Sequence, residues 1–462
     1  MPGVHTLSAS DGSDGNDRNG DPPNIVLIYT DDMGFGELSS YNAEDLRTPR
    51  LDQMADEGVR FTNFYNSSSA CSTSRGALLT GSYHQRLSVR TVFSPQSDRG
   101  LNPDEITLGD MLSEAGFTTA AIGKWHLGNA PNLRPNAQGF DLFYGIPVSH
   151  DYNYPDGKGM PFYENERIID RQIPDELYTQ RLTDRAITFI EDNRDDPFFV
   201  YLAYPMPHVP LAVTDRFKDR SQRGLYGDVM EELDHNVGRI LDTLEEHDLD
   251  DNTIVLFLSD NGPWGSYGNH AGLTGGLRGG KRNTFEGGVR TPMIAWGPGH
   301  VRSGVVEDAP AMTIDLFPTF AHLAGGQIPD DRVVDGIDIR SLLLDGRYPS
   351  VDPNRPLMFY DYSSNRLFSM RMGPWKLHFP HRHQIVDREG HDGKRGSYRW
   401  ENIGLSLYNL DDDPPETENL AGAHPEVVNQ MQQIADQYRN DLGDALQDIS
   451  PGPNVRPLGT AE

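Results

Sequence analysis

Residues 24–32 read NIVLIYTDD, an apolar run that leads directly into two adjacent aspartates. A continuous apolar run of this kind is typical of a strand buried on both faces of a parallel sheet. Residues 253–259 carry a second such run, which ends in Asp260 and Asn261. Further strands are expected over residues 118–123, 197–204 and 289–296, and helices over residues 48–57, 107–115, 178–193, 226–247 and 314–324. The alternation predicts an α/β fold with a mostly parallel sheet flanked by helices.

The sequence pattern changes after about residue 350. Short alternating segments there predict a small antiparallel sheet, and residues 425–442 predict one amphipathic helix that closes it. The N-terminal segment is rich in Ser, Asp, Gly and Asn, which predicts disorder. The expected parts are a disordered segment over residues 1–22, a large domain over residues 23–350, a smaller domain over residues 351–448 and a flexible tail over residues 449–462.

The formal net charge of −29 disfavours two classes of partner. Nucleic acids and anionic membranes both require clustered Lys and Arg, so we expect neither as a partner. No apolar run approaches the ~20 residues of a membrane span. No secretory signal is visible, so the chain as written would be cytoplasmic, or periplasmic or secreted if a signal was removed. The sequence leaves the oligomeric state open.

Asp31 and Asp32 follow one predicted strand, and Asp260 and Asn261 follow another. In parallel sheets, ligands bind beyond the carboxyl ends of the strands. Two adjacent carboxylates are costly unless a positive charge neutralises them. Oxygen ligands suit a hard divalent cation, Ca²⁺ or Mg²⁺, better than zinc. For either pair alone, helix caps and turns are an equally good interpretation.

Basic and polar residues form a second group of candidates. Lys124 and His126 follow a predicted strand, His208 follows residues 197–204, and Lys281 lies in a glycine-rich loop. Ser149 lies in the segment GIPVSHD. Each of these signals is weak alone. The chain has only six lysines, which makes Lys124 and Lys281 stronger candidates. In so acidic a protein, an anionic substrate would need a local pocket of positive charge.

Cys71 is the only cysteine of the 462 residues, so it cannot form an internal disulfide. It opens the run CSTSRGALLTG, which predicts the start of a helix, where unpaired N–H groups favour an anion. Arg75 lies one turn further on the same face. A reactive site is therefore favoured over a buried packing role, the common role of a free cysteine.

The run at residues 71–81 resembles the signature of the type I, formylglycine-dependent sulfatases, C-x-[PA]-x-R followed by Leu-Thr-Gly. The segments that also resemble that family, in its order, are residues 24–32, 123–128, 259–262, 280–290 and 315–320. The resemblance extends from about residue 24 to about residue 445 and is nearest to the arylsulfatase A and N-acetylgalactosamine-6-sulfatase branch. It implies an alkaline-phosphatase-like sandwich, with residues 23–350 as the catalytic domain.

The resemblance also implies a reaction. A separate formylglycine-generating or equivalent maturation enzyme would oxidise Cys71 to Cα-formylglycine (3-oxoalanine). One hydroxyl of its hydrate would attack the sulfur of a sulfate ester, and the other would then be deprotonated to release sulfate. One Ca²⁺ per chain would bind the sulfate and the hydrate. Sulfated sugars would be the natural substrates and aryl sulfates artificial ones.

Individual roles carry over by the same resemblance. The Ca²⁺ ligands would be Asp31, Asp32, Asp260 and Asn261. Arg75 would stabilise the ionised hydrate, Lys124 would bridge it to the sulfate, and His126 would be the base that triggers release. His208 and Lys281 would bind sulfate and protonate the leaving oxygen, and Ser149 would hydrogen-bond the sulfate. Asp260 would also help to activate the attacking hydroxyl.

Two positions depart from the family pattern. Thr73 stands where the signature has Pro or Ala, and Ser82 stands where Arg commonly follows Thr-Gly. Two other functions stay open: a phosphonate or phosphodiester hydrolase of the same superfamily, and a noncatalytic sulfated-glycan binder if Cys71 remains a thiol. Substrate specificity is expected to come from the loops over residues 150–166 and 380–399.

Overall fold

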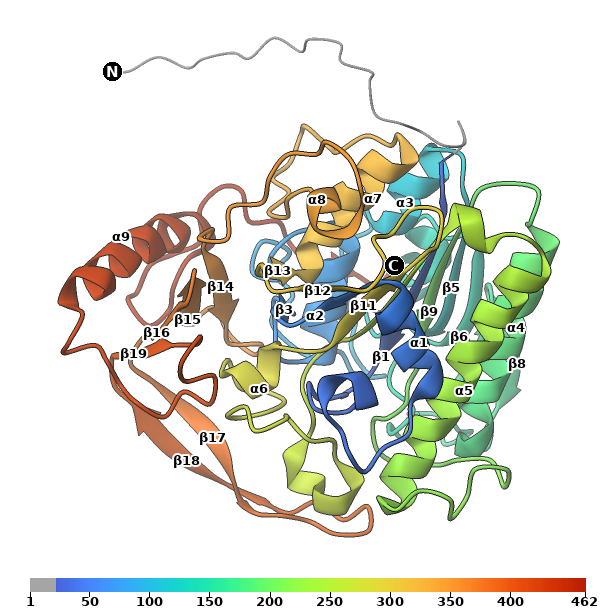
Figure 1. Ribbon diagram of the computed structural model, residues 1–462, viewed down its shortest axis with the longest axis horizontal. Coiled ribbons are helices and arrows are strands. Elements are labelled where there is room, and N and C mark those ends of the chain that lie inside the picture. Colours follow the sequence, from blue (N-terminus) through green and yellow to red (C-terminus); the bar gives the residue numbers. More distant parts are fainter. Residues whose placement is uncertain (1–21) are drawn as a thin grey trace.

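The structure, a computed structural model, describes residues 22–462 and has a ten-stranded mixed sheet at its centre (Figure 1). In order across the sheet the strands are β12 (Val305–Glu307), β2 (Val59–Phe61), β11 (Met293–Trp296), β10 (Thr253–Ser259), β1 (Asn24–Thr30), β9 (Phe198–Ala203), β5 (Thr118–Lys124), β6 (Leu142–Ile146), β7 (Pro161–Glu164) and β8 (Arg167–Arg171). The five strands from β10 to β6 pair in parallel, whereas β11 and β7 pair antiparallel with the outer members of that group. The α/β class predicted from the sequence is confirmed.

Helices cover both faces of this sheet because successive side chains of each strand point to opposite faces. Val26 and Ile28 of β1 belong to one buried apolar cluster, and Ile25 and Leu27 belong to the other. The first cluster packs against α1 (Pro49–Glu57), α4 (Tyr178–Asp192) and α5 (Gly224–Glu246). The second packs against α2 (Cys71–Thr80), α3 (Leu108–Glu114), α7 (Leu316–Ala324) and α8 (Arg340–Leu343).

The C-terminal part forms a separate small antiparallel sheet, as expected. Its strands, in order, are β14 (Leu357–Tyr360), β15 (Leu367–Met372), β16 (Trp375–His378) and β19 (Ser406–Asn409). Met431 and Ala435 of α9 (Pro425–Leu442) pack into the apolar core of this sheet. Residues 380–399, expected as a loop, instead contribute most of a two-stranded hairpin, β17 (His381–Arg388) and β18 (Ser397–Ile403).

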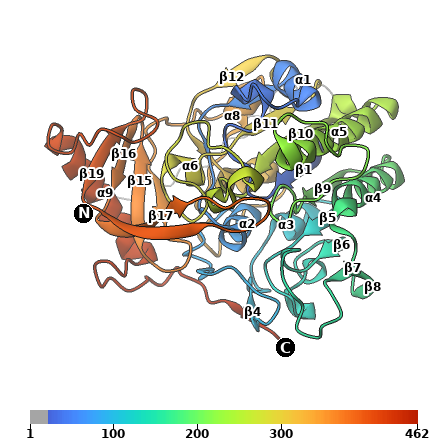
Figure 2. The ribbon, with the colours of Figure 1, turned by 90° about the horizontal axis from the view of Figure 1, so that it is seen from below.

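The C-terminal residues contact the part of the chain that carries the ten-stranded sheet. In β20 (Gly459–Thr460) the backbone pairs antiparallel with β4 (Arg99–Gly100), and Figure 2 shows the C-terminus beside that strand. The tail expected over residues 449–462 thus makes defined contacts. The predicted disordered segment, residues 1–22, lies outside the described residues except for its last position. Over residues 22–462 no helix has the length and apolar character needed to cross a membrane.

A buried polar network joins the small sheet to α6 (Glu286–Val289), a short helix that precedes β11 of the large sheet. The Glu286 carboxylate accepts hydrogen bonds from Lys376 Nζ at 2.8 Å and from the Tyr65 hydroxyl at 2.7 Å. Glu416 accepts one from the Glu286 backbone N–H at 2.7 Å and contacts His378 Nε2 at 2.7 Å. Burial alone would raise the pKa of Glu286, but Lys376 and other cations lower it to about 2. The network therefore fixes α6, and the glycine-rich loop before it, to the small sheet.

Glu286→Ala is expected to lower the free energy of unfolding by about 3–5 kcal/mol, because it leaves the buried Lys376 ammonium without its main partner. Urea denaturation measures this change. Glu164→Ala is the matched control, since Glu164 pairs with Arg167 at the surface and should cost less than about 1 kcal/mol. Equal losses in the two variants would contradict the structural role given to this network.

Candidate functional site

Two adjacent strand ends bring four oxygen-bearing residues together. Thr30, the last residue of β1, pairs with Ser259, the last residue of β10, so the residues that follow both strands lie at one edge of the sheet. They are Asp31, Asp32, Asp260 and Asn261, and all four are buried. The Asp32 backbone N–H donates to Asp260 Oδ1 at 3.2 Å, and Asn261 Nδ2 donates to Asp32 Oδ1 at 2.7 Å. The sequence predicted this juxtaposition.

Basic side chains from four different segments surround these carboxylates. Lys124, at the end of β5, donates to Asp31 Oδ2. Lys281 Nζ lies 2.6 Å from Asp32 Oδ1, and His208 Nε2 lies 3.6 Å from Asp32 Oδ2. The cluster is thus neutralised internally, which is what makes so much buried negative charge tolerable.

Arg75 completes the set of cations from α2. Its Nη2 donates to Asp260 Oδ2 at 2.8 Å and its Nε donates to the same oxygen at 3.1 Å. Its Nη1 donates to the backbone oxygen of Lys124 at 3.2 Å and to the Tyr201 hydroxyl at 3.3 Å. Arg75 therefore links the helix to three strand ends, and its guanidinium is fully buried.

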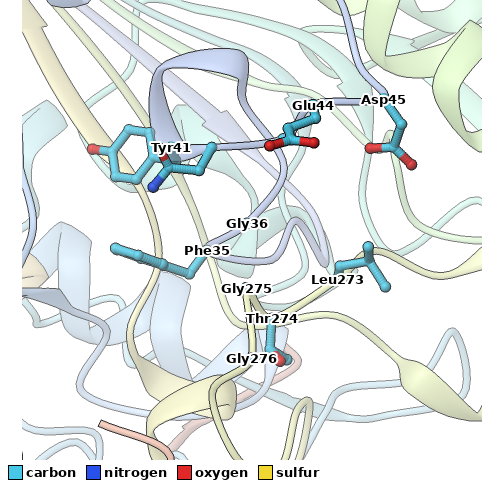
Figure 3. A pocket seen from close by; sticks show the side chains of 11 residues that line it. Phe35, Gly36, Tyr41, Glu44, Asp45, Leu273, Thr274, Gly275 and Gly276 are labelled. Atoms are coloured by element: carbon cyan, nitrogen blue, oxygen red, sulfur yellow. The ribbon is translucent and has the colours of Figure 1, made fainter.

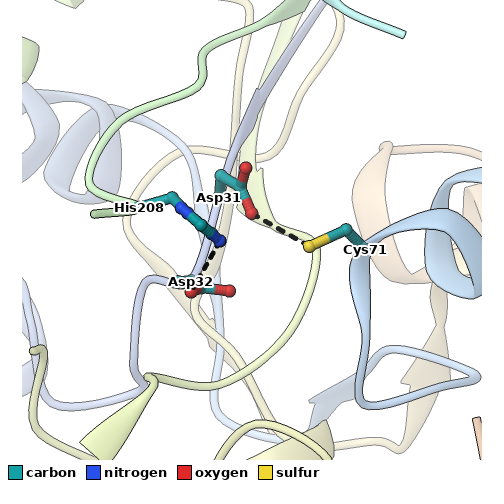
Figure 4. Close-up of side chains that lie close together, drawn as sticks. All are labelled: Asp31, Asp32, Cys71 and His208. Atoms are coloured by element: carbon teal, nitrogen blue, oxygen red, sulfur yellow. Dashed lines mark hydrogen bonds and ion pairs between the residues drawn. The ribbon is translucent and has the colours of Figure 1, made fainter. Parts of the chain in front are cut away.

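Cys71 begins α2, and its Sγ lies 3.3 Å from Asp31 Oδ1 (Figure 4). The sequence predicted an environment that favours the thiolate, but the structure shows the opposite for the thiol itself. Burial raises the pKa of Cys71, and Asp260 and Asp31 nearby raise it further. Loss of contact with water and the two carboxylates together outweigh the helix N-terminus at this position. An unmodified Cys71 would be a neutral thiol at neutral pH.

The residues present fit a hard divalent cation. Asp32 Oδ2 and Asn261 Oδ1 are buried and have no hydrogen-bond partner among the described residues. Single ligand atoms of Asp31, Asp32, Cys71 and His208 lie within 4.8 Å of one another. Of the four predicted ligands, this group contains Asp31 and Asp32. Both oxygens of Asp260, a third predicted ligand, already accept hydrogen bonds, from Arg75 and from the Asp32 backbone N–H. Oxygen donors of this kind suit Ca²⁺ or Mg²⁺.

His126 and Ser149, the other predicted residues, lie at the same edge of the sheet. His126 follows β5, and its Nε2 contacts the Phe93 carbonyl oxygen at 2.9 Å. Its Nδ1 is buried without a hydrogen-bond partner among the described residues, as is Ser149 Oγ. Burial, together with Lys124 and Arg75, lowers the pKa of His126 well below its ordinary value. The His126 side chain therefore offers a free polar atom, whereas Ser149 lies beside Asp151, whose pKa it helps to lower.

Two residues at the site carried no usable signal in the sequence. Tyr201 bonds Arg75, yet it lies within the apolar run FFVYLA and was expected to be core. Trp264 lies close to Lys281 Nζ, 4.6 Å from its ring centroid, and its ring centroid lies 5.5 Å from that of His208. It occupies a loop after β10 with no periodicity, so only the fold places it at the site.

A surface pocket of about 590 Å³ lies elsewhere, between the loop after Asp32 and residues 273–276 (Figure 3). Its lining includes Phe35, Tyr41, Glu44 and Asp45. None of the residues singled out from the sequence lines it. We place the chemistry at the buried cluster, because that is where the charged side chains converge.

Comparisons with known proteins identify the family of this chain. The sulfatase family model matches residues 23–326, and the model described as the C-terminal region of aryl-sulfatase matches residues 353–459. Mouse N-acetylgalactosamine-6-sulfatase is 39% identical over 381 residues, covering 77% of this chain and 72% of the relative. Human arylsulfatase A is 37% identical over 452 residues, covering 89% and 87%. The crystal structure of PsFucS1 sulfatase from Pseudoalteromonas sp. superposes with a TM-score of 0.81 at 27% identity, covering 92% and 91%.

Proposed function

The chain belongs to the sulfatase family of sulfuric ester hydrolases, and on that premise we propose that its buried cluster hydrolyses sulfate esters of sulfated sugars at a modified Cys71. The observation that carries the proposal is the position of Cys71 Sγ, 3.3 Å from Asp31 Oδ1 and enclosed by the cations of the cluster. A side chain at this position reaches both a cation site and the groups that can bind a sulfate.

Asp31, Asp32, Asp260 and Asn261 would hold one Ca²⁺, which supplies Lewis-acid stabilisation of a sulfate oxygen when bound. Asp32 Oδ2 and Asn261 Oδ1 support this assignment, since both are buried and lack a hydrogen-bond partner among the described residues. Asp31 and Asp32 now pair with Lys124 and Lys281. These two ammonium groups would turn to the sulfate when the carboxylates bind the cation.

Residue 71 is proposed to act as Cα-formylglycine, made from Cys71 by a maturation enzyme; its hydrate supplies one hydroxyl to attack sulfur and a second to release sulfate. Its location at the start of α2 places it beside Asp31 and one turn from Arg75. The Arg75 guanidinium, held by Asp260, would keep positive charge next to the developing oxyanion. An unmodified cysteine would lack this chemistry, because its raised pKa leaves it neutral.

The two histidines are suited to opposite proton transfers. His208 Nδ1 lies 2.5 Å from the Val209 carbonyl oxygen, an acceptor, so Nδ1 carries a proton and Nε2 is the atom that faces the cluster. Nε2 of the neutral ring is then an acceptor, and burial, with Lys281 nearby, lowers the pKa of His208 to about 4. We therefore assign Lys281 to binding the sulfate, and His208, once it takes up a proton at Nε2 beside the bound anion, to protonating the leaving oxygen. His126 Nε2 must likewise donate to the Phe93 carbonyl, which leaves Nδ1 free to accept a proton. His126 is therefore assigned as the base for sulfate release, and Ser149 Oγ as a hydrogen-bond donor to the sulfate.

The names of the relatives indicate the substrate class. N-acetylgalactosamine-6-sulfatase acts on a sulfated amino sugar by its name, and arylsulfatase A on aryl sulfates. We propose a sulfated carbohydrate as the natural substrate and aryl sulfates as artificial ones. The convergence of Cys71, Arg75, Lys124 and Lys281 on the buried carboxylates supports a catalytic site over noncatalytic glycan binding.

A comparison of two esters tests the proposed reaction. The protein, co-expressed with a formylglycine-generating enzyme, is expected to turn over p-nitrophenyl sulfate with a kcat/KM at least about 100-fold above that for p-nitrophenyl phenylphosphonate. Both esters are tetrahedral monoanions, but the sulfate presents three non-bridging oxygens to the polar side chains of the cluster, whereas the phosphonate presents two and a phenyl group. A preference for the phosphonate would replace the sulfatase assignment with the alternative from the same superfamily.

A further inference from the structure

Three cations surround one indole ring at the rim of the site. The centroid of the Trp264 ring lies 4.6 Å from Lys281 Nζ and 5.0 Å from the Cζ atoms of both Arg282 and Arg395. Lys281 is assigned to the sulfate that is cleaved, whereas the two arginines have no role in the mechanism above. Cation–π contacts stabilise each of them, but three like charges around one ring repel one another.

Arg395 comes from a distant part of the chain. It lies at the tip of the hairpin formed by β17 and β18, which Figure 1 shows extending from the small sheet toward the catalytic layer. The backbone N–H groups of Gly390 and Gly396 both donate to the Ser266 carbonyl oxygen, at 2.9 and 2.7 Å. The Tyr398 hydroxyl donates to Ser266 Oγ at 2.9 Å. The tip is therefore fastened to the loop that carries Trp264 on both sides of Arg395.

The close approach of these segments depends on small residues. A Cβ added to Gly268 would lie 2.1 Å from the Gly390 carbonyl oxygen, a distance that no side chain tolerates. The hairpin tip can thus reach the catalytic layer only because glycine occupies this position. As a result, Arg395, which is exposed, is held against Trp264 at the rim of the site.

Neither arginine at the rim is neutralised by the protein. In the part of the chain that the structure describes, neither the Arg282 nor the Arg395 guanidinium forms an ion pair. Arg399, on the same hairpin, pairs with Glu401 at 2.8 Å. The contrast is notable in a chain of net charge −29, where carboxylates are abundant. Two unpaired guanidinium groups beside a sulfate-binding lysine form a site for a second anion.

We propose that Arg282 and Arg395 bind a second anionic group, a sulfate or a carboxylate, of the substrate whose sulfate ester is cleaved beside Lys281. This specificity rests on the proposed function of the cluster. It makes the natural substrate a sugar or oligosaccharide with at least two negative charges. Because all three cations lie against the same indole ring, the second anion would bind close to the sulfate that is removed.

Binding measurements on full-length Cys71→Ala protein with Ca²⁺ test this, because that variant binds but should not consume its ligand. The probes for calorimetry are N-acetylgalactosamine 6-sulfate with one anion, N-acetylgalactosamine 4,6-disulfate with a second sulfate, and the unsaturated chondroitin 6-sulfate disaccharide with a carboxylate. At least one doubly anionic probe is expected to bind about 10-fold more tightly than the singly anionic one. The probe that gains identifies the second anion as sulfate or carboxylate.

Arg395→Gln and Arg282→Gln, added to this protein, should each remove most of that preference. Lys394→Gln is the matched control, since it removes one positive charge from the same hairpin tip and should leave the preference intact. Equal weakening of all probes by the arginine variants, or no preference in the parent protein, would overturn the proposal. Failure of the proposed function would instead be seen as an absence of sulfate-ester turnover by the matured wild-type protein, a separate measurement.

Discussion

Cys71→Ala is expected to lower kcat/KM for p-nitrophenyl sulfate by at least about 1,000-fold, with little change in the melting temperature. The substitution removes the only residue that can become formylglycine and hence the attacking group. It removes one sulfur atom from a buried position where the thiol contacts Asp31, so the fold should tolerate it. Steady-state kinetics and thermal unfolding of matured proteins measure the two effects.

Ser82→Ala is the control for this prediction. Ser82 lies just beyond the same signature, but its hydroxyl bonds the Val333 carbonyl oxygen and Arg456, away from the cluster. It should retain activity within a few-fold of the wild type, because the change touches no group at the site. Retention of full activity by Cys71→Ala would show that another residue attacks the ester, and a large loss in Ser82→Ala would show that the segment acts through folding.

Removal of divalent cations with EGTA is expected to lower kcat by on the order of 100-fold, and Ca²⁺ should restore it. Asp31 and Asp32 would hold the cation, and Lys124 and Lys281, which pair with these carboxylates without it, would then be available to the sulfate. We expect the protein to stay folded without it, because those lysines already pair with the carboxylates. Ca²⁺ at 100 times its Kd should add about 2.7 kcal/mol to the free energy of unfolding.

Asp32→Ala should abolish both the reactivation and the stabilisation by Ca²⁺. Asp45→Ala is its control, because Asp45 is an acidic residue of the neighbouring pocket that contacts Arg223 and not the cluster. Parallel titrations with Mg²⁺ identify the preferred cation. A Ca²⁺-dependent rise in melting temperature that survives in Asp32→Ala would place the cation outside this cluster.

Much of the site was predictable because it depends on where buried strands end. The runs over β1 and β10 are apolar throughout, and both end in acidic or amide residues. Parallel pairing of these two strands was enough to bring Asp31 and Asp260 together. The positions of Lys124 and His126 follow from the end of β5 in the same way.

Other parts could not be predicted, for physical reasons. The strand expected over residues 289–296 begins only at Met293, because residues 286–289 form α6 and carry a carboxylate buried in a charge network. The hairpin of β17 and β18 was expected as a loop because its exposed faces carry charged residues, including Arg382 and Arg399. The position of its tip beside Trp264 depends on contacts with Ser266, more than a hundred residues away in the chain.

The pKa of Cys71 also could not be predicted from its neighbours in the sequence. A helix N-terminus with Arg75 one turn away favours an anion, whereas burial in the folded chain, with Asp31 and Asp260 from strands remote in sequence, reverses the effect. This reversal supports the central claim, since a neutral thiol is a poor nucleophile and the residues around it are the ones proposed to bind sulfate. The encoded residue is therefore understood best as a precursor.

Mass spectrometry of the tryptic peptide that contains Cys71 tests this claim most directly. The protein should be produced with and without a formylglycine-generating enzyme, and the aldehyde fraction compared with kcat. The account predicts that the thiol is replaced by an aldehyde at residue 71, despite Thr73 in the signature, and that activity rises in proportion to the aldehyde fraction. A preparation that hydrolyses sulfate esters at full rate while Cys71 remains entirely a thiol would contradict it.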